Sequence, residues 1–215
     1  MLRIWAALFC LAATRAAACD TALLLTIDVS NSVDPGEYRL QVDGLADAVL
    51  DPQVMDALVQ GQVAVAVMQW SGAEEQAILI PWRQLRTEAD VLQFSMEARA
   101  QVRAFVLSDT APAEALAAGL AYLDAAPDCT RRVIDVSGDG TPNAGGDTLP
   151  VVRRAERAGV TINGIAIESM GMAITTYYRT SIVTRDGFVM TARMHRDYPR
   201  AIREKILREV ARIFG

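Results

Sequence analysis

The chain has 215 residues and a formal net charge of −5, from 21 basic and 26 acidic side chains. This length suits one domain of ordinary size, or two small ones. Hydrophobic residues make up 52% of the chain, which is enough for a sizeable core and argues against disorder. The acidic balance and the lack of a Lys/Arg run argue against nucleic-acid binding, because no basic stretch could neutralise a row of phosphates.

The first 18 residues have the pattern of a secretory signal. Arg3 supplies the positive end, an apolar run follows from Ile4 to Ala13, and Ala16-Ala17-Ala18 is a small-residue cleavage site. The apolar run is about half of the roughly 20 residues that a membrane span needs, and no later stretch is long and apolar enough. We therefore expect a periplasmic or secreted chain that starts near Cys19; a retained N-terminal helix is the alternative.

Apolar runs of strand length then alternate with amphipathic stretches of helix length. The run Ala22–Ile27 is typical of a strand buried on both faces. The closing stretch places Tyr198, Ile202 and Ile206 on one helical stripe. The expected strands are Ala22–Ile27, Val63–Trp70, Gln76–Ile80, Val133–Val136, Thr161–Ile167 and Gly187–Met190. The expected helices are Pro35–Leu50, Thr87–Arg103, Ala111–Ala125, Leu149–Ala158 and Asp197–Phe214.

This alternation predicts an α/β fold of three layers, in which an open, mostly parallel sheet is covered by helices on both faces. The second and third strands are expected to form a hairpin around Ser71-Gly72. The sequence has no linker, low-complexity tract or internal repeat. A single domain over residues 19–215 is therefore expected.

The first expected strand ends in the segment Asp28-Val29-Ser30-Asn31-Ser32. Residues two apart in an extended segment point the same way, so Asp28, Ser30 and Ser32 can direct three oxygens toward one point. In open α/β sheets, ligands bind beyond the carboxyl ends of the strands, where this segment lies. A carboxylate with two hydroxyls is a hard-oxygen set, suited to Mg²⁺ or Ca²⁺ rather than to a soft metal.

Two further oxygen-bearing residues extend this set. Thr110 stands just before an expected helix, and Asp139 follows an expected strand within Ser137-Gly138-Asp139-Gly140. In order and approximate spacing, the five residues resemble the metal-ion-dependent adhesion site (MIDAS) of von Willebrand factor type A (VWA) domains. These domains have a Rossmann-like fold, as integrin I domains do. Segments such as Val133–Gly140 and Tyr177-Tyr178-Arg179 look like a bacterial branch of secreted VWA-like proteins of unknown function.

The resemblance implies a function as well as a fold. It implies that the hydroxyls of Ser30, Ser32 and Thr110 bind Mg²⁺, or Mn²⁺ or Ca²⁺, directly, while Asp28 and Asp139 act partly through water. An Asp or Glu of a partner protein would then fill an open coordination position. The expected protein is thus an extracytoplasmic, metal-dependent binding module and not an enzyme.

Other interpretations stay open at this point. The chain could be a structural or assembly subunit with an inactive metal site, or a metal-assisted hydrolase that uses Asp28 and Asp139. Ser30, Ser32 and Thr110 could be plain helix caps, and Asp139 a plain turn residue. No nucleophile elbow or phosphate-binding glycine loop is present in the sequence.

Two polar residues outside this set have structural interpretations. The only histidine, His195, just before the last helix, is expected at the surface or at a helix cap. Asp135 lies inside an expected strand, where a hydrogen-bonding role at the core edge is expected.

Two cysteines remain once the leader, which contains Cys10, is removed. Cys19 lies nine residues before Asp28, and Cys129 lies ten before Asp139. Both therefore fall at the amino-terminal edge of two parallel strands, which the VWA resemblance makes neighbours. This register predicts a Cys19–Cys129 disulfide in an oxidising compartment. Lipidation of Cys19 and two free thiols are the alternatives.

Overall fold

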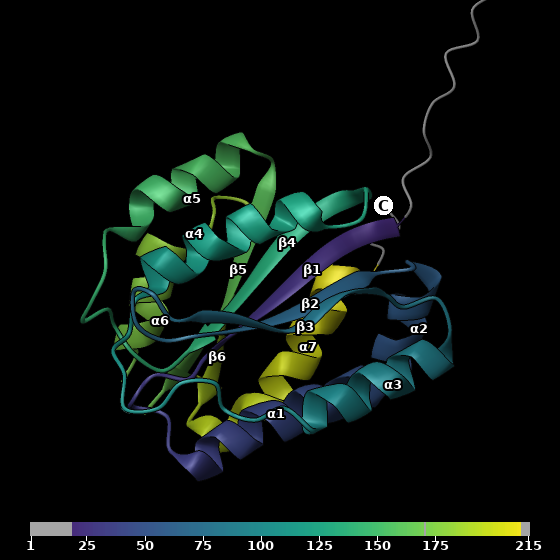
Figure 1. Ribbon diagram of the computed structural model, residues 1–215, viewed down its shortest axis with the longest axis horizontal. Helices are drawn as coiled ribbons and strands as arrows, with labels where there is room; N and C mark the ends of the chain where they lie inside the picture. The colour runs from purple at the N-terminus through teal and green to yellow at the C-terminus, as the bar shows by residue number, and fades with distance from the viewer. Residues whose placement is uncertain (1–18, 170, 212–215) are drawn as a thin grey trace, which may run out of the picture.

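A computed structural model describes residues 19–169 and 171–211. Its middle layer is a six-stranded sheet in the order β3-β2-β1-β4-β5-β6, and helices cover both faces (Figure 1). The strands are β1 (Cys19–Asp28), β2 (Ala64–Trp70), β3 (Gln76–Gln84), β4 (Cys129–Gly138), β5 (Val160–Glu168) and β6 (Val189–Arg193). The helices are α1 (Pro35–Leu50), α2 (Pro52–Gln60), α3 (Glu88–Arg99), α4 (Pro112–Tyr122), α5 (Thr148–Arg157), α6 (Ala173–Tyr177) and α7 (Tyr198–Val210). Shorter helical turns cover Leu123–Ala125, Tyr178–Ile182 and His195–Asp197.

The pairing of the strands is mostly parallel. β1 lies between β2 and β4 and is parallel to both, and β5 and β6 continue the sheet in the same direction. Only β3 runs antiparallel, as the second arm of a hairpin with β2. The predicted α/β fold with a mostly parallel sheet and a β2–β3 hairpin is therefore confirmed.

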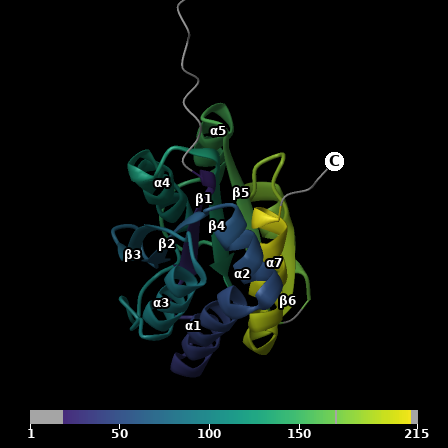
Figure 2. The ribbon, with the colours of Figure 1, turned by 90° about the vertical axis from the view of Figure 1, so that its right-hand side faces the viewer.

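The two faces of the sheet carry different helices. α1, α2, α3 and α7 pack on one face, where Leu23, Leu25 and Ile27 of β1 join their core. α4 and α5 cover the other face, toward which Ala22 and Leu24 point. Figure 2 shows α2 beside α7, and α4 and α5 together on the far side of the sheet. Since β1 is buried on both sides, its unbroken apolar run is explained.

Several element boundaries differ from the sequence prediction. α3 ends at Arg99 and not at Arg103, and Ala100 is its C-cap residue. Arg103 lies in the loop that follows, where its guanidinium donates to the backbone oxygens of Val29 and Ser30. α2 was not predicted, and its nine residues bury only Val54 and Leu58. α6 and the turn after it form a helical stretch where none was expected. The predicted end of the last helix at Phe214 lies outside the described residues.

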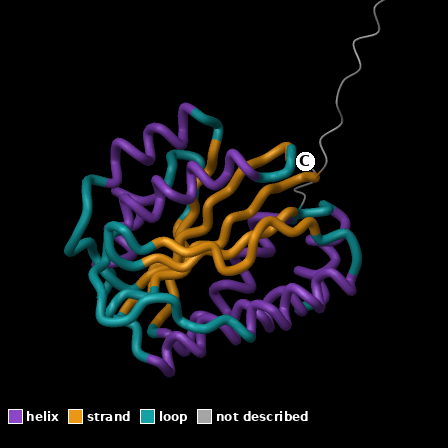
Figure 3. Tube along the Cα trace, viewed as in Figure 1, coloured by secondary structure: helices purple, strands orange, loops and turns teal. Residues whose placement is uncertain are grey.

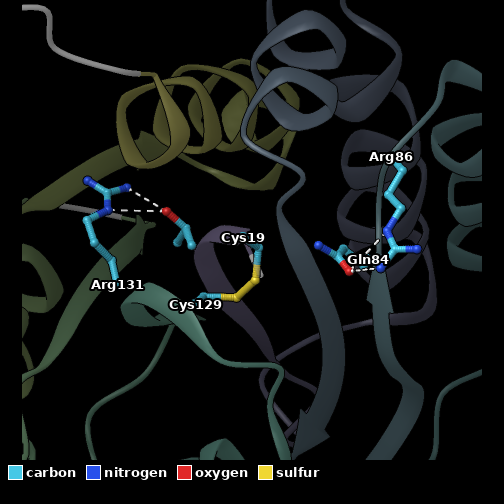
Figure 4. The surroundings of a disulfide bond; sticks show 6 residues. Cys19, Gln84, Arg86, Cys129 and Arg131 are labelled. Atoms are coloured by element: carbon cyan, nitrogen blue, oxygen red, sulfur yellow. Dashed lines mark hydrogen bonds between the residues drawn. A yellow bond between two sulfur atoms is a disulfide. The ribbon is translucent and has the colours of Figure 1, made fainter. Parts of the chain in front are cut away.

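The amino-terminal edge of the sheet carries the predicted disulfide. Cys19 and Cys129 are direct partners in the β1–β4 register, with their Cα atoms 4.5 Å apart, and their sulfur atoms are bonded (Figure 4). This separation lies within the range that disulfides require. The bond joins the two central strands at the edge opposite the segment that begins at Asp28. The predicted leader, residues 1–18, lies outside the described residues.

Within residues 19–169 and 171–211, no helix is long and apolar enough to cross a bilayer.

Candidate metal centre

The carboxyl ends of β1 and β4 meet at one edge of the sheet, and the loops that follow them gather there, at the left in Figure 3. Asp28, the last residue of β1, is fully buried. Its Oδ1 atom accepts a hydrogen bond from the Ser30 backbone at 2.8 Å. Its Oδ2 atom is buried and finds no hydrogen-bond partner among the described residues. A buried carboxylate oxygen left in this state is costly, and a cation, a water molecule or a proton at that atom would remove the cost.

A chain of hydroxyls connects Asp28 and its loop to the segment after β4. The hydroxyl oxygens of Ser30 and Ser32 lie 3.2 Å apart. Ser32 Oγ in turn donates to Asp139 Oδ1 at 2.6 Å. Residues that are 107 positions apart in the chain are thus in direct contact.

Thr110 reaches the same place from the loop before α4. A Cβ atom built on Gly140 would lie 3.7 Å from Thr110 Oγ1 and 3.9 Å from Ser32 Oγ, so these two oxygens flank Gly140. The backbone N–H of Thr110 donates to Asn143 Oδ1 at 2.7 Å, which ties this loop to the segment after β4. The structure therefore brings Asp28, Ser30, Ser32, Thr110 and Asp139 together; that they bind a metal stays a prediction.

The interpretation of these hydroxyls as plain helix caps is wrong. The N-cap residue of α1 is Asp34, whose carboxylate accepts from Glu37 N at 2.8 Å. The N-cap position of α4 is held by Ala111 and not by Thr110. The three hydroxyls are therefore available for another role at the sheet edge.

Burial dominates the electrostatics of Asp28. Loss of water around the carboxyl raises its pKa to about 7, against the opposing effect of hydrogen bonds from Ser30 and with a smaller contribution from the charge of Asp139. The pKa of Tyr178 is raised well above its usual value, mainly by burial and secondly by the negative charge of Asp28. A Cβ atom on Gly138 would lie only 2.6 Å from the Tyr178 hydroxyl oxygen and 2.8 Å from Asp28 Oδ2. Glycine is therefore required there for the two side chains to approach the backbone.

His195 is not where the sequence predicted it. It is only 6% exposed, and its Nδ1 atom lies 3.0 Å from Glu37 Oε1. Its Nε2 atom lies 3.8 Å from Asp139 Oδ2. Sequence reasoning missed Glu37 and His195 as neighbours of the site. The available signal was the position of His195 two residues after β6, at the carboxyl edge of a parallel strand.

Asp135 takes part in a different group, inside the core. Its Oδ2 atom lies 2.6 Å from the Lys205 ammonium. Both side chains are buried between the sheet and α7. The predicted hydrogen-bonding role at the core edge is thus replaced by a fully buried ion pair.

The comparisons with known proteins identify the family and the fold of the chain. A family model described as "Protein of unknown function (DUF1194)" matches residues 18–214. This chain belongs to the DUF1194 family. No curated protein matches the sequence of this DUF1194 protein.

Solved structures show which fold this DUF1194 protein has. Proximal thread matrix protein 1 from the mussel byssus, with a zinc-occupied MIDAS motif, is similar at a TM-score of 0.67 and 16% identity, over 88% of this chain and 48% of that one. The pilus adhesin SpaC from Lactobacillus rhamnosus GG is similar at a TM-score of 0.61 and 11% identity, over 90% of this chain and 31% of that one. The von Willebrand factor domain of the type V pili tip protein Mfa5 from Porphyromonas gingivalis is similar at a TM-score of 0.60 and 11% identity. The match covers 92% of this chain and 98% of that one.

These likenesses confirm the predicted VWA-like fold. At such low identity they bear on the fold alone. The chain spans about half the length of the mussel protein and about a third of the length of the adhesin SpaC.

Proposed function

We propose that this protein is a metal-dependent protein-binding module of the MIDAS type. One observation carries the proposal: the buried Asp28 Oδ2 atom is without a hydrogen-bond partner in the described chain and belongs to a group of hydroxyls and carboxylates from three separate segments. A hard divalent cation is the species that such a donor set accommodates best.

In the proposed site, Ser30, Ser32 and Thr110 hold the ion through their hydroxyls, and Asp28 and Asp139 hold it directly or through water. Mg²⁺ is the expected ion, with Mn²⁺ and Ca²⁺ as alternatives. When bound, the ion supplies positive charge and an open position for a carboxylate. The Ser32–Asp139 hydrogen bond and the Arg103 contacts to Val29 and Ser30 keep the loops in place, so that the ligands are positioned before the ion arrives.

The partner in this proposal is a protein that presents an Asp or Glu side chain. Two structural relatives, a pilus adhesin and a pili tip protein, support a binding role over catalysis. We also propose that residues 19–215 form one module after removal of a leader over residues 1–18. The Cys19–Cys129 disulfide supports a periplasmic or secreted location, and it occupies the sulfur that lipidation of Cys19 would need.

Calorimetry with Mg²⁺ and Mn²⁺ on the purified protein tests the metal site. We expect one ion per chain, no binding by Asp28→Ala, and weaker binding by Ser30→Ala. Asp56→Ala, which removes an exposed carboxylate on α2, is the matched control and should bind as the wild type does. Unchanged binding by Asp28→Ala would refute the assignment of the ligands.

Partner capture tests the second half of the proposal. The immobilised protein should retain a binding partner from a periplasmic extract in Mg²⁺, and should release it in chelator. Asp28→Ala should retain none under either condition. A partner that Asp28→Ala captures equally well in chelator would support the alternative of an assembly subunit with an inactive metal site.

A further inference from the structure

A second polar cluster shares Asp139 with the candidate metal centre. It consists of Glu37 in the first turn of α1, Asp139 after β4, and His195 between β6 and α7. One nitrogen or oxygen atom from each side chain lies within 4.8 Å of the other two. Three elements that are far apart in the sequence therefore converge on one small volume.

The two nitrogen atoms of His195 have different surroundings. Nδ1 lies 3.0 Å from Glu37 Oε1, so the carboxylate favours the tautomer of the uncharged ring that has its proton on Nδ1. Nε2 then carries a lone pair. This atom is buried and lacks a hydrogen-bond partner in residues 19–169 and 171–211.

The bare Nε2 atom faces Asp139 Oδ2 across 3.8 Å, which is too long for a hydrogen bond. Two electron-rich atoms thus face each other inside the protein, and a cation between them would satisfy both. Zinc binds imidazole nitrogen and carboxylate oxygen at about 2.1 Å, which places two ligands of a tetrahedral ion about 3.4 Å apart. The observed gap therefore fits such an ion after a small closure.

Both carboxylates are already oriented toward the imidazole. Glu37 Oε2 accepts from the Asp34 backbone at 2.9 Å, within the capping box of α1, and this leaves Oε1 facing His195. Asp139 Oδ1 accepts from Ser32 Oγ at 2.6 Å, which leaves Oδ2 facing Nε2. A carboxylate on the outer nitrogen of a ligating histidine is a common feature of zinc sites, where it fixes the tautomer and the ring orientation.

We propose that His195 Nε2 and Asp139 Oδ2 form a second metal site beside the candidate MIDAS, and that Glu37 positions the imidazole. An imidazole ligand favours Zn²⁺ or a similar transition metal over Mg²⁺ and Ca²⁺. The side chain of Glu37 is one-third exposed and that of Asp139 is 11% exposed, so water can reach the ion and complete its coordination. The site shares Asp139 with the candidate MIDAS but does not use Asp28, so substitution of Asp28 separates the two proposals.

The test uses Zn²⁺ as the probe and tag-free Asp28→Ala protein, in which the first site is removed. Calorimetry should show one Zn²⁺ per chain and no response to Mg²⁺. Adding His195→Ala should abolish Zn²⁺ binding. Adding Glu37→Ala should weaken it roughly 10–100-fold, the usual effect of losing such an orienting partner. Glu37→Gln should restore most of the affinity, since its amide oxygen can still accept from Nδ1.

Asp90→Ala is the matched control for Glu37→Ala. Asp90 has the same place in the capping box of α3 that Glu37 has in α1, but it lies outside the cluster. It should leave Zn²⁺ binding unchanged, which separates loss of a helix cap from loss of the histidine partner. Thermal unfolding of each variant checks that it is folded.

Nuclear magnetic resonance gives a second readout in the unsubstituted protein. Because the chain has one histidine, its imidazole ¹⁵N signals report on His195 alone. Zn²⁺ should shift the Nε2 signal and leave a protonated Nδ1. No Zn²⁺ binding by Asp28→Ala, or equal binding with and without His195, would overturn the proposal and leave a proton between His195 and Asp139. If the wild-type protein does not bind Mg²⁺, that result would instead count only against the proposed function.

Discussion

The ammonium group of Lys205 lies 2.6 Å from a carboxylate oxygen of Asp135, and both side chains are at most 2% exposed. Lys205 is on α7 and Asp135 is in the middle of β4. The same ammonium donates to Glu209 Oε1 at 2.6 Å, and that oxygen also accepts from Asn163 of β5 at 2.8 Å. Buried charge therefore fastens the last helix to the two strands beneath it.

Lys205→Met should destabilise the protein strongly. The substitution leaves Asp135 and Glu209 buried without their cation, and breaking a buried pair in this way costs about 3–5 kcal/mol. Urea unfolding measures the loss. Arg203 lies on the same helix as Lys205 and forms a partly exposed ion pair with Asp51, which lies just before α2. Arg203→Ala should therefore cost at most about 1 kcal/mol. Equal losses for the two variants would contradict this account.

The same cluster predicts a pH dependence of stability. Burial raises the pKa of Glu209 from 4.5 to about 7, against the attraction of Lys205, and burial likewise raises the pKa of Asp135. The folded protein therefore holds a proton on Glu209 more tightly than the unfolded chain does. This contribution to the free energy of unfolding is full below the unfolded pKa and is lost as the pH rises through the folded value.

We expect the urea midpoint of the wild type to fall as the pH rises from about 4.5 to about 7. Glu209→Gln, which does not titrate, should reduce that fall. Glu204→Gln, an exposed neighbour on α7, serves as the control and should keep the wild-type slope. An unchanged slope in Glu209→Gln would show that this carboxyl is not responsible.

Asp28→Ala should separate stability from binding. In chelator, the variant should be as stable as the wild type or more so, because it removes a buried carboxylate oxygen that has no partner in the described residues, a group that costs about 1–3 kcal/mol. With Mg²⁺ at about 100 times its dissociation constant, the wild type should gain about 2.7 kcal/mol and the variant nothing. Thermal unfolding in both conditions measures this, and an equal Mg²⁺ effect on both proteins would contradict it.

The disulfide should stabilise the fold without affecting the metal site. The bond spans 110 residues, for which the chain-entropy treatment gives about 4–5 kcal/mol as an upper figure. The double variant Cys19→Ala, Cys129→Ala should lose stability in urea and keep its Mg²⁺ affinity, because the cysteines lie at the opposite edge of the sheet. Mass spectrometry of unreduced protein should find the two peptides linked; two freely alkylated thiols would exclude the bond.

Local patterns in the sequence were sufficient to predict the six strands and most of the helices, although not α2 or α6, and the resemblance to VWA domains grouped the five candidate ligands. β1 is recognisable because burial on both faces demands an unbroken apolar run. Asp28 ends β1 and Asp139 directly follows β4, so the parallel direction of these strands places both residues at one edge and Cys19 and Cys129 at the other. That the two strands are neighbours was implied by the VWA resemblance. These relationships depend on periodicity and register, which are properties of short segments.

The neighbours of the site were decided only by the tertiary structure. The position of His195 after β6 places it at the carboxyl edge of the sheet, but the direction of its ring, between Glu37 of α1 and Asp139, depends on how α1 and the turn before α7 pack. Likewise, Asp135 and Lys205 each look out of place when considered alone, a carboxylate in a strand and the only lysine of the chain. A buried charge is tolerated only with its partner, and the distance between those partners is set by helix packing and not by any local pattern.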